Sequence, residues 1–188
     1  MNRSFAVLLL LLSAAVTVQA AAPMPAVPRL QFEKYSLPNG LEVILVEDKR
    51  LPLVTVNTWY HVGPAEEKPG RTGFAHLFEH MMFQGSKNAP GDIYNRLIEE
   101  AGGDNNASTS FDRTNYYQTL PSNQLELVLW LESDRMTSLL EELDQEKLTN
   151  QQDVVRNERR QSFENRPYGL FDEGHTTRCS PRVIPITA

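Results

Sequence analysis

Two histidines and a glutamate lie within five consecutive residues, His76-Leu77-Phe78-Glu79-His80. On a helix, residues i and i+4 lie one above the other, so His76 and His80 can direct a ring nitrogen at one ion. Imidazole nitrogen binds Zn²⁺ at about 2 Å. Glu79 can reach a metal-bound water without being a ligand itself. The spacing predicts a hydrolytic zinc site, and the alternative is a helix with two exposed histidines.

Glu158 is the best candidate for a third ligand, which a catalytic zinc usually needs beside its water. Leu148, Gln151, Val155 and Glu158 fall at i, i+3, i+7 and i+10, which is one face of a helix. A carboxylate on a partly apolar face needs a partner that offsets its desolvation, and a metal ion is one such partner. The residues also allow a surface glutamate paired with a neighbouring arginine.

Four segments, two of which contain the candidate site residues named above, carry a resemblance to a known family. The chain resembles the N-terminal part of the pitrilysin/insulinase family of zinc peptidases, the inverzincins, whose H-x-x-E-H inverts the H-E-x-x-H order of thermolysin-like enzymes. The resemblance covers roughly residues 30 to 169. The segments that carry it are Gly73–Ser86, Gly102–Ser110, Asp112–Tyr117 and Asp153–Arg160.

The resemblance implies a zinc metalloendopeptidase that acts on peptide or protein substrates. It implies that His76, His80 and Glu158 bind one Zn²⁺ ion and that Glu79 is the general base. Zinc lowers the pKa of its bound water to about 7 and polarises the scissile carbonyl, while the base moves the proton to the leaving amine. Some relatives carry a glutamate where this chain has Gln151, which can hydrogen-bond a ligand but cannot supply charge.

Substrate binding in this family is similar to the addition of a β-strand to an open sheet edge. The run from Ala107 to Leu120 is rich in Thr, Phe and Tyr, and it predicts a strand after the turn-forming residues 102–105. By resemblance, Asn106 and Ala107 hold the peptide near the metal. For Asn106 the alternative is an ordinary asparagine-rich turn.

These residues must be positioned by strands and helices, whose order along the chain predicts an α+β fold. In this fold, helices pack on one side of an antiparallel sheet. The resemblance implies one incomplete half of a metallohydrolase similar to the mitochondrial processing peptidase. The pattern predicts strands at Leu41–Val46, after the turn Pro38-Asn39-Gly40, and at Leu53–Val62. It predicts helices at Asp92–Ala101, from a Ser122 cap to about Leu140, and around Glu158 as far as Pro167.

The first twenty residues predict a signal peptide. Arg3 precedes an apolar run from Phe5 to Val18, and Val18-Gln19-Ala20 offers small residues for cleavage. We expect export to the periplasm or the medium, with no stable membrane insertion after cleavage. Retention as an anchor is the alternative, although the run is shorter than the roughly 20 apolar residues of a spanning helix. A Pro-rich linker at 21–29 follows.

Charge and cysteine content limit the partners. The formal net charge of −6 argues against nucleic acid as a partner, and the single Cys179 cannot form an internal disulfide.

We expect an incomplete peptidase-family domain at 30–174 and an atypical tail at 175–188, which suggests a truncated or frame-shifted product. Family members continue further and close a chamber with a second, similar half, so the chain is expected to need such a half-domain or a homo-oligomer.

Three function hypotheses follow from these observations. The first is an exported zinc metalloendopeptidase. The second is a non-catalytic, zinc-binding remnant or subunit that needs a second half. The third is a lyase of the S-ribosylhomocysteine type, which shares H-x-x-E-H but is disfavoured by the signal peptide and by the place of Cys179 in the tail.

Overall fold

The computed structural model describes residues 30–68 and 71–171, so the predicted signal peptide, linker and tail lie outside the described residues. The chain divides into two units between Lys49 and Arg50. The described part of the first unit is a hairpin of β1 (Glu33–Ser36) and β2 (Glu42–Leu45). Gly40 in its turn has φ 88°, a conformation that favours glycine. The predicted turn and the strand after it are confirmed.

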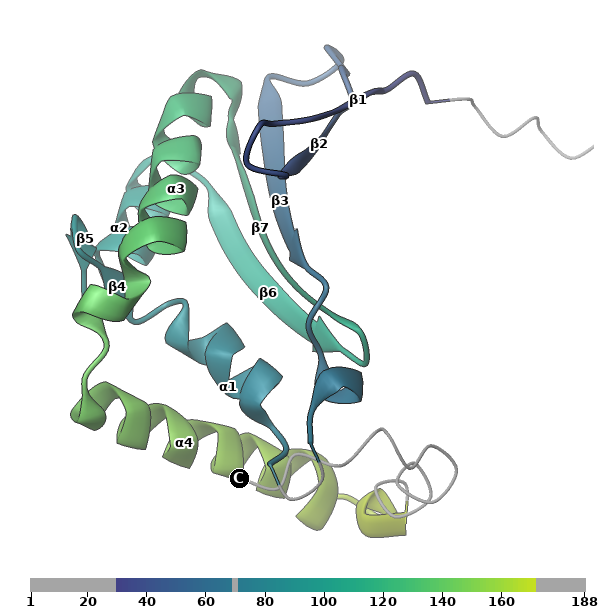
Figure 1. Ribbon diagram of the computed structural model, residues 1–188, viewed down its shortest axis with the longest axis vertical. Coiled ribbons are helices and arrows are strands. Elements are labelled where there is room, and N and C mark those ends of the chain that lie inside the picture. The colour runs from purple at the N-terminus through teal and green to yellow at the C-terminus, as the bar shows by residue number, and fades with distance from the viewer. Residues whose placement is uncertain (1–29, 69–70, 172–188) are drawn as a thin grey trace, which may run out of the picture. The chain divides into compact units, whose positions relative to one another are not determined.

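The second unit is built on an antiparallel sheet of three strands (Figure 1). These are β3 (Leu53–Tyr60), β7 (Arg113–Pro121) and β6 (Asp104–Ser110), in the order β3-β7-β6. The strand predicted at Leu53–Val62 is thereby confirmed with a slightly earlier end. Within the described part of the chain no strand pairs with the outer side of β6, so its edge is open.

The strand predicted from Ala107 to Leu120 is wrong, because this segment folds as two strands. Ser110 of β6 pairs with Arg113 of β7, and Phe111 and Asp112 form the loop between them. The Asn-Gly or Asp-Gly pair that usually marks such a loop is missing. Residues typical of strands continue through the turn, so composition alone did not reveal it.

Helices pack on one face of the sheet, which confirms the predicted α+β class (Figure 1). They are α2 (Ile93–Glu100), which agrees with the predicted helix, and α3 (Leu125–Glu142). The core between α2, α3 and the sheet contains the fully buried residues Ile98, Leu120, Val128 and Leu131. None of the described helices is both long and apolar enough to cross a membrane.

The predicted Ser122 cap is wrong. Residues Ser122–Gln124 form a 3-10 turn, and α3 begins only at Leu125 without a side-chain cap. The backbone N–H of Ser122 donates to the carbonyl of Pro52 at 2.9 Å, so the end of β7 is tied to the start of β3 instead.

Two more helices complete the unit. Helix α1 (Phe74–Met81) is linked to α2 by a short hairpin of β4 (Gly85–Ser86) and β5 (Ala89–Pro90). Helix α4 (Gln145–Arg159) packs against α1, continues as a π-helical turn over Arg160–Glu164, and ends before Pro167 as predicted.

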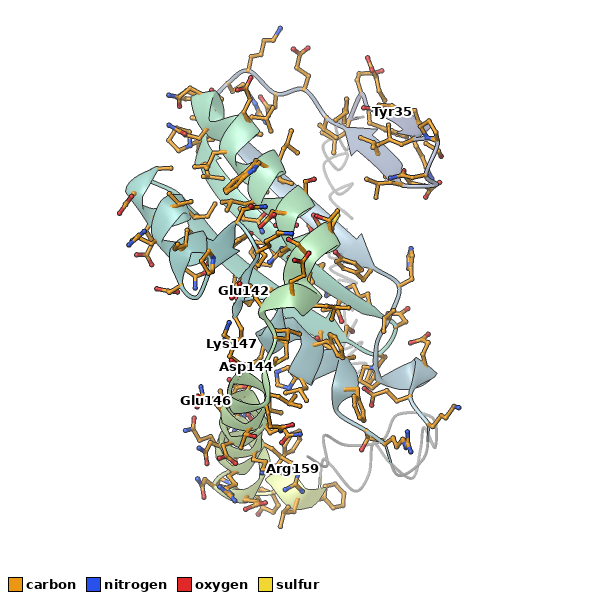
Figure 2. The ribbon with its side chains drawn as sticks, turned by 60° about the vertical axis from the view of Figure 1, so that its left-hand side comes forward. Tyr35, Glu142, Asp144, Glu146, Lys147 and Arg159 are labelled. Atoms are coloured by element: carbon orange, nitrogen blue, oxygen red, sulfur yellow. The ribbon has the colours of Figure 1, made fainter. Side chains whose placement is uncertain are left out.

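The corner between α3 and α4 is fixed by polar contacts (Figure 2). Asp144 caps α4 by accepting from the backbone N–H of Lys147 at 2.7 Å. The ammonium of Lys147 donates to the carbonyl of Glu142 at the end of α3, also at 2.7 Å. This corner sets the direction in which α4 runs past α1.

A buried ion pair ties α3 to the sheet. Arg135 is 1% exposed, and its guanidinium donates to Glu132 at 2.6 Å. The Glu132 carboxylate is also the acceptor for three polar groups on β3, α2 and β7. The guanidinium lies over aromatic rings 4.4 to 5.6 Å away. The three donors are Thr58, Tyr94 and Gln118, and the rings are those of Phe83, Tyr94 and Tyr116.

We expect the Arg135→Met variant to lose about 3–5 kcal/mol of unfolding free energy, because it leaves the Glu132 carboxylate buried without its cation. Chemical denaturation measures this loss. The control is Arg156→Met, which removes an exposed pair with Asp153 and should cost less than about 1 kcal/mol. Equal losses in the two variants would contradict the role given to the buried pair.

Candidate metal centre

Helix α1 carries the H-x-x-E-H residues and is held at its start by Glu67. Gly73 precedes the helix with φ 89° and has no side chain with which to cap it. The Glu67 carboxylate accepts from the backbone N–H groups of Gly73 and Ala75, each at 2.8 Å. It supplies the cap, and its charge suits the helix N-terminus. Sequence reasoning missed Glu67, because no local motif links it to the helix.

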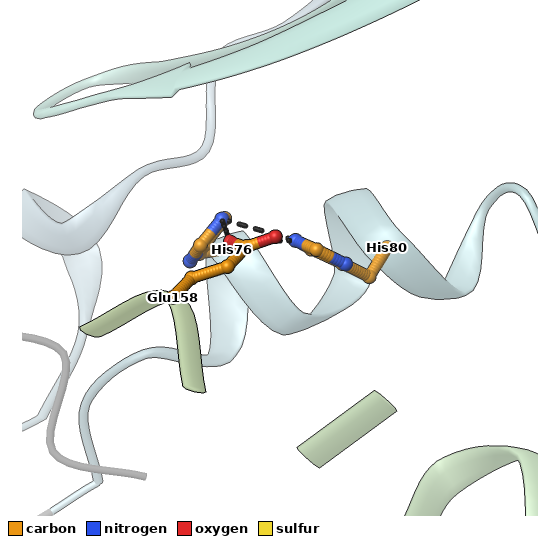
Figure 3. A group of neighbouring side chains, drawn as sticks. All are labelled: His76, His80 and Glu158. Carbon is orange, nitrogen blue, oxygen red and sulfur yellow. Dashed lines mark hydrogen bonds and ion pairs between the residues drawn. The ribbon is translucent and has the colours of Figure 1, made fainter. Parts of the chain in front are cut away.

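The side chains of His76, His80 and Glu158 converge from two helices (Figure 3). The Nε2 atoms of His76 and His80 lie 3.1 Å apart, and Oε2 of Glu158 lies 3.4 Å from each of them. The histidines are one turn apart on α1, and Glu158 comes from the face of α4 that also buries Gln151 and Val155. The structure therefore brings together the three residues that the sequence predicts as ligands.

This triangle fits a zinc ion. A tetrahedral Zn²⁺ with bonds of about 2.0–2.1 Å holds its ligand atoms about 3.3 Å apart. His80 Nδ1 lies 3.3 Å from Oε1 of Gln151, and that acceptor requires the proton on Nδ1, which leaves the Nε2 lone pair free. The donor set of two imidazoles and one carboxylate is typical of catalytic zinc.

The electrostatics of His76 agree with a ligand role. Burial, with a further contribution from neighbouring His80, lowers the pKa of His76 below its ordinary value. The ring is therefore neutral at pH 7 and offers a lone pair. All three side chains are only partly buried, which leaves the centre open to a substrate.

The arginine alternative for Glu158 is less consistent with the structure. Arg156 donates to Asp153 at 3.0 Å, and Arg160 donates to Asn157 at 2.8 Å. Arg159 donates to Glu164 at 2.6 Å. The carboxylate of Glu158 faces the two histidines instead.

The remaining predicted site residues lie on α1 and on the edge strand. Glu79 points to β6, where Oγ1 of Thr109 donates to its Oε2 at 2.5 Å. Asn106 and Ala107 lie on β6, and Oδ1 of Asn106 accepts from the N–H of Ala107 at 2.8 Å. Asn106 is thus in a strand and not in a turn. Sequence reasoning named neither Thr109 nor its bond, which joins segments distant in the sequence.

An apolar groove lies on the other side of α1. Among the described residues that line it, the only charged side chain is that of Asp144, which caps α4. On the helix the groove residues are well separated from the face that carries His76 and His80. The groove therefore has no group suited to the chemistry of the metal centre. Phe74, Leu77, Phe78 and Met81 line it from α1, and Leu143, Gln145 and Leu148 complete it.

Known proteins resemble this chain over most of its length. Zinc protease PqqE of Helicobacter pylori is 34% identical over 165 residues, which are 87% of this chain and 37% of that protein. A crystal structure of a protease from Helicobacter pylori has a TM-score of 0.71 and 34% identity, and the match covers 76% of this chain and 34% of that one. The chain thus spans roughly a third of these relatives.

A third relative carries a different name. Cytochrome b-c1 complex subunit 1 of Rattus norvegicus is 30% identical over 154 residues, 82% of this chain and 31% of that protein. Similarity to this chain therefore extends to a protein that is named for an assembly and not for proteolysis.

The family model for insulinase, peptidase family M16, matches residues 42–180. The match includes β2, the second unit as far as residue 180, and thus the first residues of the segment expected to be an atypical tail. It agrees with the four segments that carry the resemblance in the sequence. The chain belongs to the insulinase family, peptidase family M16.

Proposed function

We propose that this chain carries the catalytic metal centre of an exported zinc metalloendopeptidase. His76, His80 and Glu158 bind one Zn²⁺ ion, and Glu79 is the general base. The observation that carries the proposal is the triangle of donor atoms, 3.1 to 3.4 Å on a side, contributed by α1 and α4. Glu79 lies next to this triangle, and its carboxylate is not one of the three proposed ligands, so it is available to act as the base.

Glu79 and Gln151 have different roles in the proposed hydrolysis. Bound zinc supplies a water of lowered pKa and polarises the scissile carbonyl. Glu79 accepts a proton at Oε1, since Oε2 already accepts from Thr109, and it returns that proton to the leaving amine. Gln151 holds the ring of His80 in the orientation that presents Nε2.

The open edge of β6 is the proposed binding site for the peptide. A substrate that adds as a strand is recognised through its backbone, which tolerates many sequences. Asn106 and Ala107 lie on this strand, and α1 packs beside it. The N–H of Ala107 is occupied by the Asn106 side chain, so a substrate carbonyl would take the place of that amide oxygen.

A non-catalytic role is the second candidate. Its support is that the chain spans about a third of its relatives and that one relative is named as a subunit of cytochrome b-c1 complex. In either case we propose a second half-domain or a further copy of this chain as partner. The lyase alternative loses its basis, because the family is one of peptidases.

Export to the periplasm or the medium is part of the proposal. The apolar run from Phe5 to Val18 and the small residues at Val18 and Ala20 support it. Sequencing the N-terminus of the exported chain tests it, and the expected first residue is Ala21.

We expect the full chain to bind one zinc ion, and His76→Gln to weaken binding more than about a hundredfold because it removes a ligand. Equilibrium dialysis against a zinc buffer measures both affinities. His61→Gln is the control, because His61 is exposed and outside the centre. Similar losses in both variants would place the ion elsewhere.

Replacement of Glu79 by Gln is expected to abolish cleavage of a quenched-peptide library by the zinc-loaded full chain and to leave zinc bound, since an amide cannot accept the proton. The control Glu146→Gln alters an exposed glutamate on α4 (Figure 2) and should cleave as the parent does. An unchanged rate in Glu79→Gln would rule out this base. No cleavage by the parent would favour the subunit role.

A further inference from the structure

The Glu79 carboxylate is held by one hydrogen bond from the edge strand. Oγ1 of Thr109 lies 2.5 Å from Oε2 of Glu79. An ionised carboxylate only accepts hydrogen bonds, so the threonine hydroxyl is the donor. Within the described residues the side chain of Glu79 has no other hydrogen-bonding partner. This bond therefore decides how the carboxylate is oriented.

The surroundings of Thr109 leave its proton for Glu79. The hydroxyl of Thr114 lies 3.3 Å from that of Thr109 and donates its own proton to the carbonyl of Val62 at 2.9 Å. Thr114 is buried, and threonine has few rotamers in a strand. The hydroxyl of Thr109 is thus fixed in position, whereas the side chain of Glu79 without this hydrogen bond could rotate about three bonds.

The backbone of Thr109 faces the open edge. Ser110 and Arg113 form the pair that closes a two-residue hairpin loop. Ser110 and every second residue before it on β6 therefore exchange backbone hydrogen bonds with β7. The residues between them, Thr109 and Ala107, present their N–H and C=O groups outward. The N–H of Ala107 agrees with this pattern, since it bonds to the Asn106 side chain.

We infer that Thr109 is a positioning residue that couples the bound peptide strand to the general base. This inference rests on the proposed function of the same site. The backbone of Thr109 lies on the edge to which a peptide would add, and its hydroxyl holds Oε2 of Glu79. Oε1 is then the oxygen left for the reacting water, and its place relative to the peptide is set by a single residue of β6.

Two variants separate this role from a merely structural one. Thr109→Val keeps the shape and removes the donor, and Thr109→Ser keeps the donor. In the zinc-loaded full chain we expect Thr109→Val to lower kcat about tenfold or more with KM changed less than about twofold, because a misplaced base slows only the chemical step. Thr109→Ser should restore most of kcat.

The control is Thr119→Val on β7, which removes an exposed hydroxyl contact with Thr55 at 3.0 Å and should leave both constants unchanged. Zinc affinity should be equal in all variants. Parent-like kcat in Thr109→Val, or a loss that appears in KM alone, would overturn the inference.

A binding measurement tests the inference without turnover. Acetohydroxamic acid binds a metal as its anion and gives its proton to a carboxylate beside the metal. In the cobalt-loaded full chain, followed by visible absorption, Thr109→Val and Glu79→Gln should each weaken acetohydroxamate binding about tenfold at unchanged cobalt affinity. Thr109→Ser should bind it as the parent does.

These measurements distinguish a failure of the proposed peptidase activity from a failure of the positioning role of Thr109. If the parent cleaves no peptide but Thr109→Val still weakens acetohydroxamate, the independent peptidase activity fails and the positioning role stands. If Thr109→Val binds acetohydroxamate as tightly as the parent, the positioning role is overturned whether or not the parent cleaves peptides.

Discussion

The packing of α4 against α1 is the contact on which the site depends. It places one oxygen of Glu158 at 3.4 Å from the Nε2 atoms of His76 and His80, which are themselves 3.1 Å apart. Without this contact the two histidines are neighbours on a helix of only eight residues, too short to be stable alone. The buried residues Gln151 and Val155 hold α4 in place, and Glu67 holds the start of α1.

The site and the core are mechanically connected. Arg135 lies over the rings of Phe83 and Tyr116, and Tyr116 packs with Met82 directly after α1. The ion pair that fixes α3 on the sheet therefore also supports the end of the helix that carries the histidines. Thr109 connects the same helix to the edge strand through Glu79. Glu79, the two histidines and the open edge of β6, to which we assign catalysis, zinc binding and substrate binding, are thus held by one set of contacts.

Local patterns were enough to predict the three side chains that converge between α1 and α4. The spacing of His76 and His80 follows from one helical turn, and the face that carries Glu158 follows from helical periodicity. The sheet, its helical layer and the first hairpin turn also follow from short-range signals. Two local predictions failed, at the β6–β7 turn and at Ser122. The turn lacks its usual residues, and Ser122–Gln124 form a 3-10 turn before α3 begins.

The parts that sequence could not provide are long-range contacts. Glu67 caps a helix from outside it, and Thr109 reaches Glu79 from another element. Such pairs obey no fixed spacing, so no periodic pattern reveals them. The Arg135 network is similar, since a buried arginine is stabilised only by the rings and the carboxylate that the fold brings around it.

X-ray absorption at the zinc edge of the zinc-loaded full chain identifies the atoms that bind the ion. We expect a first shell of nitrogen and oxygen at about 2.0–2.2 Å, with two imidazoles, and the loss of one light ligand in Glu158→Ala. A sulfur ligand at about 2.3 Å, or a first shell unchanged by Glu158→Ala, would contradict a site built by α1 and α4.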